Sequence, residues 1–176
     1  MSHPRGSAPL VVTAELPVDL FAWSNQLRTE HFPAHRNYLK AHVTLFHALP
    51  PKVEGELRDL LARLANRVPV PGRLEGLVSL GRGTALALSS PQMLELRDEI
   101  ADHFHGMLTA QDQGRPRLHI TVQNKVSPEE AKALQEKLAP RVTPRQFAFR
   151  GLELHAYLGG PWERLGIWRF RSGKRD

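Results

Sequence analysis

Residues 41–45, Ala-His-Val-Thr-Leu, and residues 118–122, Leu-His-Ile-Thr-Val, repeat one pattern of histidine, aliphatic residue, threonine and aliphatic residue. This alternation of polar and apolar side chains is typical of a β-strand, whose successive side chains point to opposite faces of a sheet. In each motif the histidine and the threonine therefore share one face, and the aliphatic residues anchor the strand in the core. Each strand thus presents an imidazole beside a hydroxyl.

The rest of the sequence predicts further strands and helices around the two motifs. Apolar runs bounded by proline and glycine predict strands over residues 10–16, 40–49, 74–80, 84–88, 115–126, 147–158 and 163–170. Helical spacing of apolar residues, with serine-proline starts at two of the helices, predicts helices around residues 20–27, 53–64, 91–104 and 128–138. Because each motif strand is followed directly by a proline-started helix, the sequence predicts an α+β fold of two pseudo-symmetric lobes.

Length and composition limit the possible classes of protein. The 176 residues fit a single domain over 1–176, with 1–9 and 172–176 expected to be loose. The absence of cysteine excludes disulfides, a thiolate nucleophile and a cysteine-based zinc site. No apolar run is long enough for a signal peptide or a membrane span, so we expect a cytoplasmic protein with no membrane partner. A formal net charge of +6 favours a polyanionic partner.

The two motifs together supply the groups that hydrolysis of a phosphodiester requires. His42 and His119 can act as acid and base, because the ordinary pKa of imidazole, about 6.5, lies close to working pH. Thr44 and Thr121 can donate hydrogen bonds to the phosphate oxygens as charge develops. This chemistry needs no metal and no cofactor. Either motif alone could equally be a strand histidine bonded to backbone, so the prediction depends on the pair.

At these residues the sequence resembles the 2H phosphoesterase superfamily, in particular the bacterial 2′-5′ RNA ligases, also described as RNA 2′,3′-cyclic phosphodiesterases. The resemblance spans residues 10–170, and its core is HVTL at 42–45 and HITV at 119–122. It implies a bilobal α+β fold with two antiparallel sheets around a central cleft and helices packed outside. The chain departs from the usual pattern after each motif, where it reads Phe46-His47-Ala48 and Gln123-Asn124-Lys125.

The resemblance also implies an activity and roles for the motif residues. The activity is hydrolysis of a 2′,3′-cyclic phosphate of RNA or a nucleotide to a 2′-phosphate, with 2′-5′ ligation as the possible reverse reaction. His42 would donate a proton to the leaving 3′ oxygen, and His119 would accept one from water. Thr44 and Thr121 would hold the phosphate.

Five further residues are candidates for substrate binding. On an unbroken strand, Phe46 and Gln123 would point to the same face as the histidine and threonine of their motifs, toward the cleft. For Phe46, packing in the core is the alternative. Arg117 and Lys125 flank the second motif and could guide a phosphate backbone, unless they are simply solvated surface charges. Tyr157, beside Trp162 at the last turn, could form a platform for a base, with hairpin packing as the alternative.

Two other functions remain open at this stage. A non-catalytic RNA-binding module would use the same basic cleft and would bind RNA in a salt-sensitive way without forming product. A metal-dependent phosphoesterase would be silenced by a chelator. The sequence does not choose between tRNA, oligonucleotides and mononucleotides as substrates, and it does not predict an oligomeric state.

Overall fold

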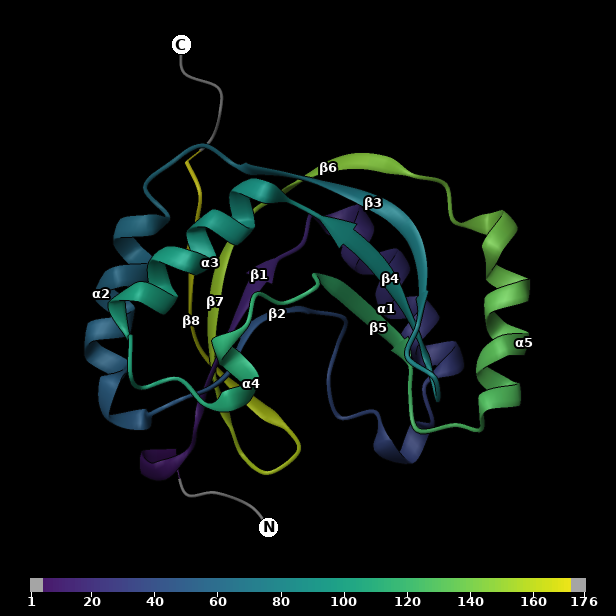
Figure 1. Ribbon diagram of the computed structural model, residues 1–176, viewed down its shortest axis with the longest axis horizontal. Helices are drawn as coiled ribbons and strands as arrows, with labels where there is room; N and C mark the ends of the chain where they lie inside the picture. The colour runs from purple at the N-terminus through teal and green to yellow at the C-terminus, as the bar shows by residue number, and fades with distance from the viewer. Residues whose placement is uncertain (1–4, 172–176) are drawn as a thin grey trace.

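A computed structural model of the protein describes residues 5–171. Its strands form two four-stranded sheets in which every neighbouring pair is antiparallel (Figure 1). The first sheet has the order β2-β1-β7-β8, with β1 Leu10–Glu15, β2 Val43–Leu49, β7 Gly151–Tyr157 and β8 Trp162–Arg169. The second has the order β5-β4-β3-β6, with β3 Val70–Ser79, β4 Thr84–Ser89, β5 His119–Gln123 and β6 Arg145–Phe149. The predicted α+β class with two antiparallel sheets is confirmed.

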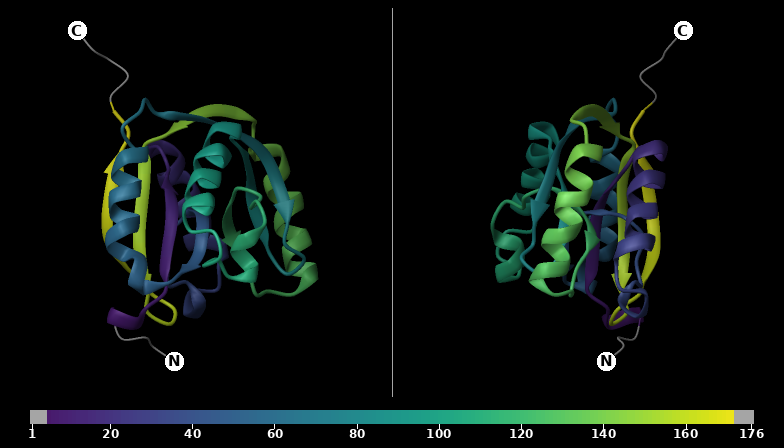
Figure 2. Two further views of the ribbon diagram at one scale, coloured as in Figure 1. Left: turned by 60° about the vertical axis from the view of Figure 1, so that its left-hand side comes forward. Right: turned by 90° about the vertical axis from the view of Figure 1, so that its right-hand side faces the viewer.

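Within residues 5–171, five α-helices accompany the sheets: α1 Val18–His31, α2 Glu54–Leu64, α3 Pro91–His103, α4 Ala110–Gln113 and α5 Pro128–Leu138. Helix α2 lies beside the first sheet and α5 beside the second, at opposite ends of the molecule (Figure 2). Ser90 and Ser127 cap α3 and α5, each accepting a hydrogen bond from the backbone N–H three residues later, as the serine-proline starts predict. No helix within residues 5–171 has the length and apolar character needed to cross a membrane.

The two motif strands, β2 and β5, are edge strands of different sheets. Their aliphatic residues Val43, Leu45, Ile120 and Val122 are fully buried in one continuous apolar cluster that includes side chains from both sheets. Each motif is therefore anchored in a shared core, and its histidine and threonine lie on the opposite face of the strand.

One predicted strand is two strands in the structure. The segment predicted over 147–158 divides at Arg150, so that β6 pairs with β3 of the second sheet and β7 pairs with β1 of the first. Both parts are rich in apolar and aromatic residues, and nothing local marks the change of partner. The sheet to which each part belongs is decided by the strand already lying beside it.

Two other differences concern the ends of elements. Residues 70–72, which precede the strand predicted over 74–80, belong to β3, because they pair with β6. Of the tails predicted to be loose, residues 5–7 form a 3-10 helix, whereas residues 1–4 and 172–176 lie outside the described residues.

Candidate active site

The two motif histidines hold their rings in the same way. The Nδ1 atom of His42 lies 2.7 Å from the carbonyl oxygen of Lys40, and Nδ1 of His119 lies 2.7 Å from the carbonyl oxygen of Arg117. A carbonyl oxygen can only accept a hydrogen bond, so Nδ1 carries the proton in both rings. The neutral form of each ring therefore leaves Nε2 as the atom with a free lone pair, which is the atom needed for proton transfer.

His42 lies among several positively charged side chains, and His119 is one of them. Burial, together with the positive charges of Arg28, His119 and His47, lowers the pKa of His42 to about 4, although the hydrogen bond to the carbonyl of Lys40 acts in the opposite direction. Strands β2 and β5 contact each other although they belong to different sheets; His42 directly precedes β2, and His119 begins β5. Both side chains are half-buried. The structure thus brings the motif histidines together, as the sequence predicts.

The motif threonines lie in equivalent places of the two sheets. Thr44 pairs with Thr13 of β1, and Thr121 pairs with Ala85 of β4, one strand in from the edge. Both motif threonines are half-buried. Within residues 5–171, neither hydroxyl group forms a hydrogen bond with another protein group, so both hydroxyls can turn toward a ligand.

A buried arginine joins the two motifs. Arg28 of α1 is only 4 % exposed and has no carboxylate partner among residues 5–171. Its Nε donates to the carbonyl oxygen of Leu39 at 2.9 Å, just before the first motif, and one Nη donates to the carbonyl oxygen of Thr121 at 3.0 Å. Burial lowers the pKa of Arg28 to about 10, which still leaves it charged at neutral pH. The site therefore lies beside a positive charge that no acidic side chain neutralises.

The predictions for Phe46 and Gln123 are wrong for one shared reason. A β-bulge follows the threonine of each motif: Thr44 and Phe46 pair with the consecutive residues Thr13 and Val12, and Thr121 and Gln123 pair with Ala85 and Thr84. The extra residue reverses the strand parity, so the next side chain points away from the cleft.

Both displaced side chains have other partners. Phe46 is 0 % exposed and packs in the core under the guanidinium of Arg97, 4.2 Å from the ring centroid. Gln123 is 5 % exposed, and its Oε1 accepts a hydrogen bond from the hydroxyl of Thr84 at 3.0 Å. Neither side chain is available to a substrate.

The three remaining candidates lie near the motifs, but the structure gives none of them a role in the site. Arg117 and Lys125 are exposed on either side of β5, and Lys125 adopts a left-handed backbone conformation with a φ of 60°. Tyr157 ends β7, where it pairs with Trp162 across the hairpin. Their roles in substrate binding stay predictions.

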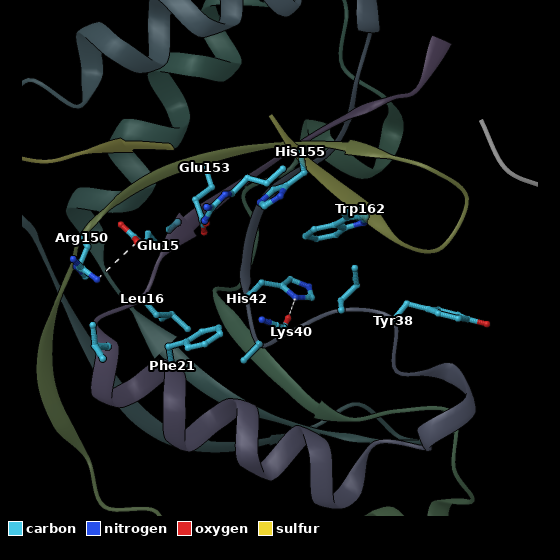
Figure 3. Close-up of a pocket in the computed structure, with 15 residues that line it drawn as sticks. Glu15, Leu16, Phe21, Tyr38, Lys40, His42, Arg150, Glu153, His155 and Trp162 are labelled. Carbon is cyan, nitrogen blue, oxygen red and sulfur yellow. Dashed lines mark hydrogen bonds and ion pairs between the residues drawn. The ribbon is translucent and has the colours of Figure 1, made fainter. Parts of the chain in front are cut away.

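A cavity beside His42 contains residues that sequence reasoning missed. It encloses about 620 Å³ on the open face of the first sheet, and Glu153, His155 and Trp162 contribute to its wall (Figure 3). The ring of Trp162 lies 4.7 Å from that of His42 and 5.0 Å from that of His155. Burial, with the positive charge of His42, lowers the pKa of His155 to about 4. The alternation of polar residues at 153, 155 and 157 with buried aliphatic ones was the sequence signal for this wall.

A second missed group holds β2 in place. Asp112 of α4 is 1 % exposed and accepts hydrogen bonds from the backbone N–H groups of His47 and Ala48, each at 2.9 Å, and from Nδ1 of His47 at 3.1 Å. These bonds keep the pKa of Asp112 below its usual value although burial acts in the opposite direction. Nothing in the sequence around Asp112 marks this contact. Among residues 5–171, no three histidine or acidic side chains gather in a group able to hold a metal ion.

Comparison with known proteins identifies the family. The sequence profile of the 2′-5′ RNA ligase superfamily matches residues 16–161, which include both motifs. The chain belongs to this superfamily. Membership in the 2′-5′ RNA ligase superfamily confirms the resemblance to 2H phosphoesterases stated from the motifs. No curated protein sequence matches the chain.

Solved structures share the fold over nearly the whole chain. A protein of Thermus thermophilus is 20 % identical, with a TM-score of 0.65 over 94 % of this chain and 100 % of that one. E. coli LigT complexed with 3′-AMP is 18 % identical, with a TM-score of 0.61 over 93 % and 98 % of the two chains. E. coli LigT complexed with NADP+ is 17 % identical, with a TM-score of 0.59 over the same shares.

Proposed function

We propose that this protein is a metal-independent phosphoesterase that opens 2′,3′-cyclic phosphates of RNA or nucleotides to 2′-phosphates. The observation that carries the proposal is the matched pair of imidazoles. His42 and His119 each have the Nδ1 proton bound to backbone, His42 directly before the edge strand β2 and His119 at the start of the edge strand β5 of the other sheet, and β2 and β5 contact each other. Two such rings across one cleft can serve as the base and the acid of a single displacement at phosphorus.

The reaction assigns one task to each group. Water attacks phosphorus while His119 takes a proton from it, the bond from phosphorus to the 3′ oxygen breaks, and His42 gives that oxygen a proton. The products are a 2′-phosphate and a free 3′ hydroxyl. Thr44 and Thr121 donate hydrogen bonds to the non-bridging oxygens, and the buried charge of Arg28 stabilises the anion.

The nature of the partner is supported by charge and by the relatives. The net charge of +6 attracts a phosphate-bearing ligand. E. coli LigT has been crystallised with 3′-AMP and with NADP+, so a protein of this fold accommodates nucleotides. We propose RNA or a nucleotide ending in a 2′,3′-cyclic phosphate as the substrate, and the cytoplasm as the location.

Turnover of nucleoside 2′,3′-cyclic phosphates in the presence of EDTA tests the proposal. We expect a 2′-phosphate as product and a loss of at least about 100-fold in kcat/KM for His42→Ala and for His119→Ala, because each removes one proton-transfer group. His105→Ala, at an exposed histidine after α3, is the matched control and should keep full activity.

Three results would contradict this function. Undiminished turnover in either histidine variant would remove the two-histidine mechanism. Activity that EDTA abolishes would indicate the metal-dependent alternative. Salt-sensitive RNA binding without any product, retained in both histidine variants, would indicate the RNA-binding alternative.

A further inference from the structure

The two sheets carry the same motif but differ in the residues beside it. In the first sheet Thr44 lies in one row with Thr13 and Glu153, whereas in the second sheet the row that contains Thr121 continues with Ala85 and Val78. In the proposed reaction, the chemistry at phosphorus uses the histidine and the threonine that both sheets carry. Among the polar groups found in the first sheet alone, Glu153, which pairs with Arg164 at 3.5 Å, lines the cavity beside His42.

These extra polar groups form one connected wall. The hydroxyl of Thr13 lies 3.0 Å from Nε2 of His155 and 3.3 Å from Oε1 of Glu153. Burial and the nearby charge of Glu15 raise the pKa of Glu153. Burial of such polar side chains costs free energy unless they form hydrogen bonds with one another or with a ligand. The wall faces the 620 Å³ cavity, whose size is typical of small-molecule sites.

Aromatic and aliphatic side chains line other parts of the same cavity. Figure 3 shows His42, His155 and Trp162 gathered at one end, with Glu153, Leu16 and Phe21 farther along. Trp162 is half-buried and keeps part of its indole open to the cavity. A flat aromatic surface with hydrogen-bonding groups nearby is the combination that proteins use to bind unpaired bases.

We propose that this cavity binds the nucleobase of the nucleotide whose phosphate lies at His42 and His119, with the base on Trp162 and its polar edge at Glu153. The proposal rests on the proposed function for the position of the phosphate. Because base and cyclic phosphate are carried by one ribose, a phosphate at His42 leaves the base beside the cavity that His42 borders. An ionised carboxylate accepts hydrogen bonds only, so Glu153 should favour bases with an exocyclic amino group. Cytosine should therefore bind better than uracil, which presents a carbonyl at that position.

Binding measurements test the stacking partner without requiring catalysis. The ligands are cytidine 2′-monophosphate, uridine 2′-monophosphate and ribose 5-phosphate, which has a phosphate but no base, titrated calorimetrically at pH 8. Trp162→Ala should weaken binding of both nucleotides by about 10-fold or more, because stacking of one base on an aromatic ring contributes that much. It should leave the affinity for ribose 5-phosphate unchanged, and Trp162→Phe should keep most of the nucleotide affinity.

Fluorescence provides a direct readout of the same contact. Nucleotide should quench the tryptophan emission of the wild type, and the quenching should disappear in Trp162→Phe. Trp23→Phe is the matched control, because Trp23 of α1 lines a separate hollow with Asp19 and Arg145. That variant should keep both the quenching and the affinity.

The contact between Glu153 and the polar edge of the base has its own test. The wild type should bind the cytidine nucleotide more tightly than the uridine nucleotide, and Glu153→Gln, which can donate as well as accept, should bring the ratio of the two dissociation constants close to one. Equal affinities in the wild type would overturn the role of Glu153.

The outcomes separate this inference from the proposed function. If Trp162→Ala binds nucleotides and ribose 5-phosphate as the wild type does, the base subsite is wrong, even if His42 and His119 prove essential for turnover. If no cyclic phosphate is hydrolysed but nucleotide binding still depends on Trp162, the subsite stands and the proposed activity falls.

Discussion

His42 and His119 each donate their Nδ1 proton to the carbonyl oxygen of the residue two positions earlier. The acceptor is a backbone carbonyl next to the motif, so each imidazole is oriented without a carboxylate. The two rings differ in their surroundings, because His42 also contacts Trp162 and lies near the charge of Arg28. A depressed pKa makes His42 neutral at pH 7 in the free protein, whereas a proton donor must be protonated.

A bound phosphate should therefore raise the pKa of His42. Its negative charge opposes the desolvation and the neighbouring positive charges that hold this pKa at about 4 in the free protein. By linkage, the protonated form of His42 should bind adenosine 2′-monophosphate more tightly than the neutral form does. Titration of the His42 ring proton by NMR, with and without the nucleotide, measures the shift. An unchanged pKa would place the phosphate away from His42.

At the scale of the element, β2 pairs with β1 on one side and is held on its outer edge by a partner that is not a strand. As an edge strand it exposes backbone N–H groups, and the bulge after Thr44 leaves part of it out of register with β1. Asp112 accepts the N–H groups of His47 and Ala48 and also fixes the His47 ring. The short helix α4 thus closes the exposed edge and holds the strand that follows the first motif.

Asp112→Asn should destabilise the fold by about 2–3 kcal/mol, since an amide replaces one accepting oxygen with a donor beside two backbone N–H groups. The loss is measured from urea unfolding at pH 7. Asp98→Asn, at an exposed carboxylate paired with Arg115, is the control and should change stability by less than about 0.5 kcal/mol.

The pH dependence gives a second measure of Asp112. Because folding lowers its pKa, its contribution is fully present above the ordinary value of 3.8 and is lost as the pH falls through the lower folded value. The difference between wild type and Asp112→Asn should therefore shrink in acid. A constant difference down to about pH 2 would contradict this account.

At the scale of the whole molecule, two buried arginines connect parts of the active site that are distant in sequence. Arg28 of α1 bonds to the carbonyl of Thr121 on β5, and Arg97 of α3 bonds to the carbonyl of Leu45 on β2 at 3.2 Å and to the carbonyl of Asp112. Each stacks on a phenylalanine, Phe32 and Phe46 respectively. The relative position of the two motif strands thus depends on planar guanidinium groups that donate several bonds at once.

Arg28→Met should lower kcat for a cyclic phosphate by at least about tenfold, because small displacements of reacting groups are costly. It should also raise the pKa of His42, since a positive charge nearby is removed. Arg28→Lys should keep the pKa of His42 low, because the positive charge remains, but should lower kcat in part. Arg58→Met, which removes a bond from α2 to the carbonyl of Leu165, is the control for loss of an arginine elsewhere. A His42 pKa that stays at its wild-type value in Arg28→Met would contradict the electrostatic link.

The sequence by itself determined the two motifs, their placement on strands, the serine-capped helices that follow and the α+β class, because these depend on side-chain periodicity and capping within short segments. Tertiary structure decided the rest. The bulges that turn Phe46 and Gln123 into the core exist only in relation to β1 and β4, and the division at Arg150 depends on which strand lies alongside. The neighbours of His42, from Arg28 to Trp162, come from separate elements. A local pattern states which way a side chain would point on a regular strand, but the pairing partner sets the register and the packing sets which face is covered.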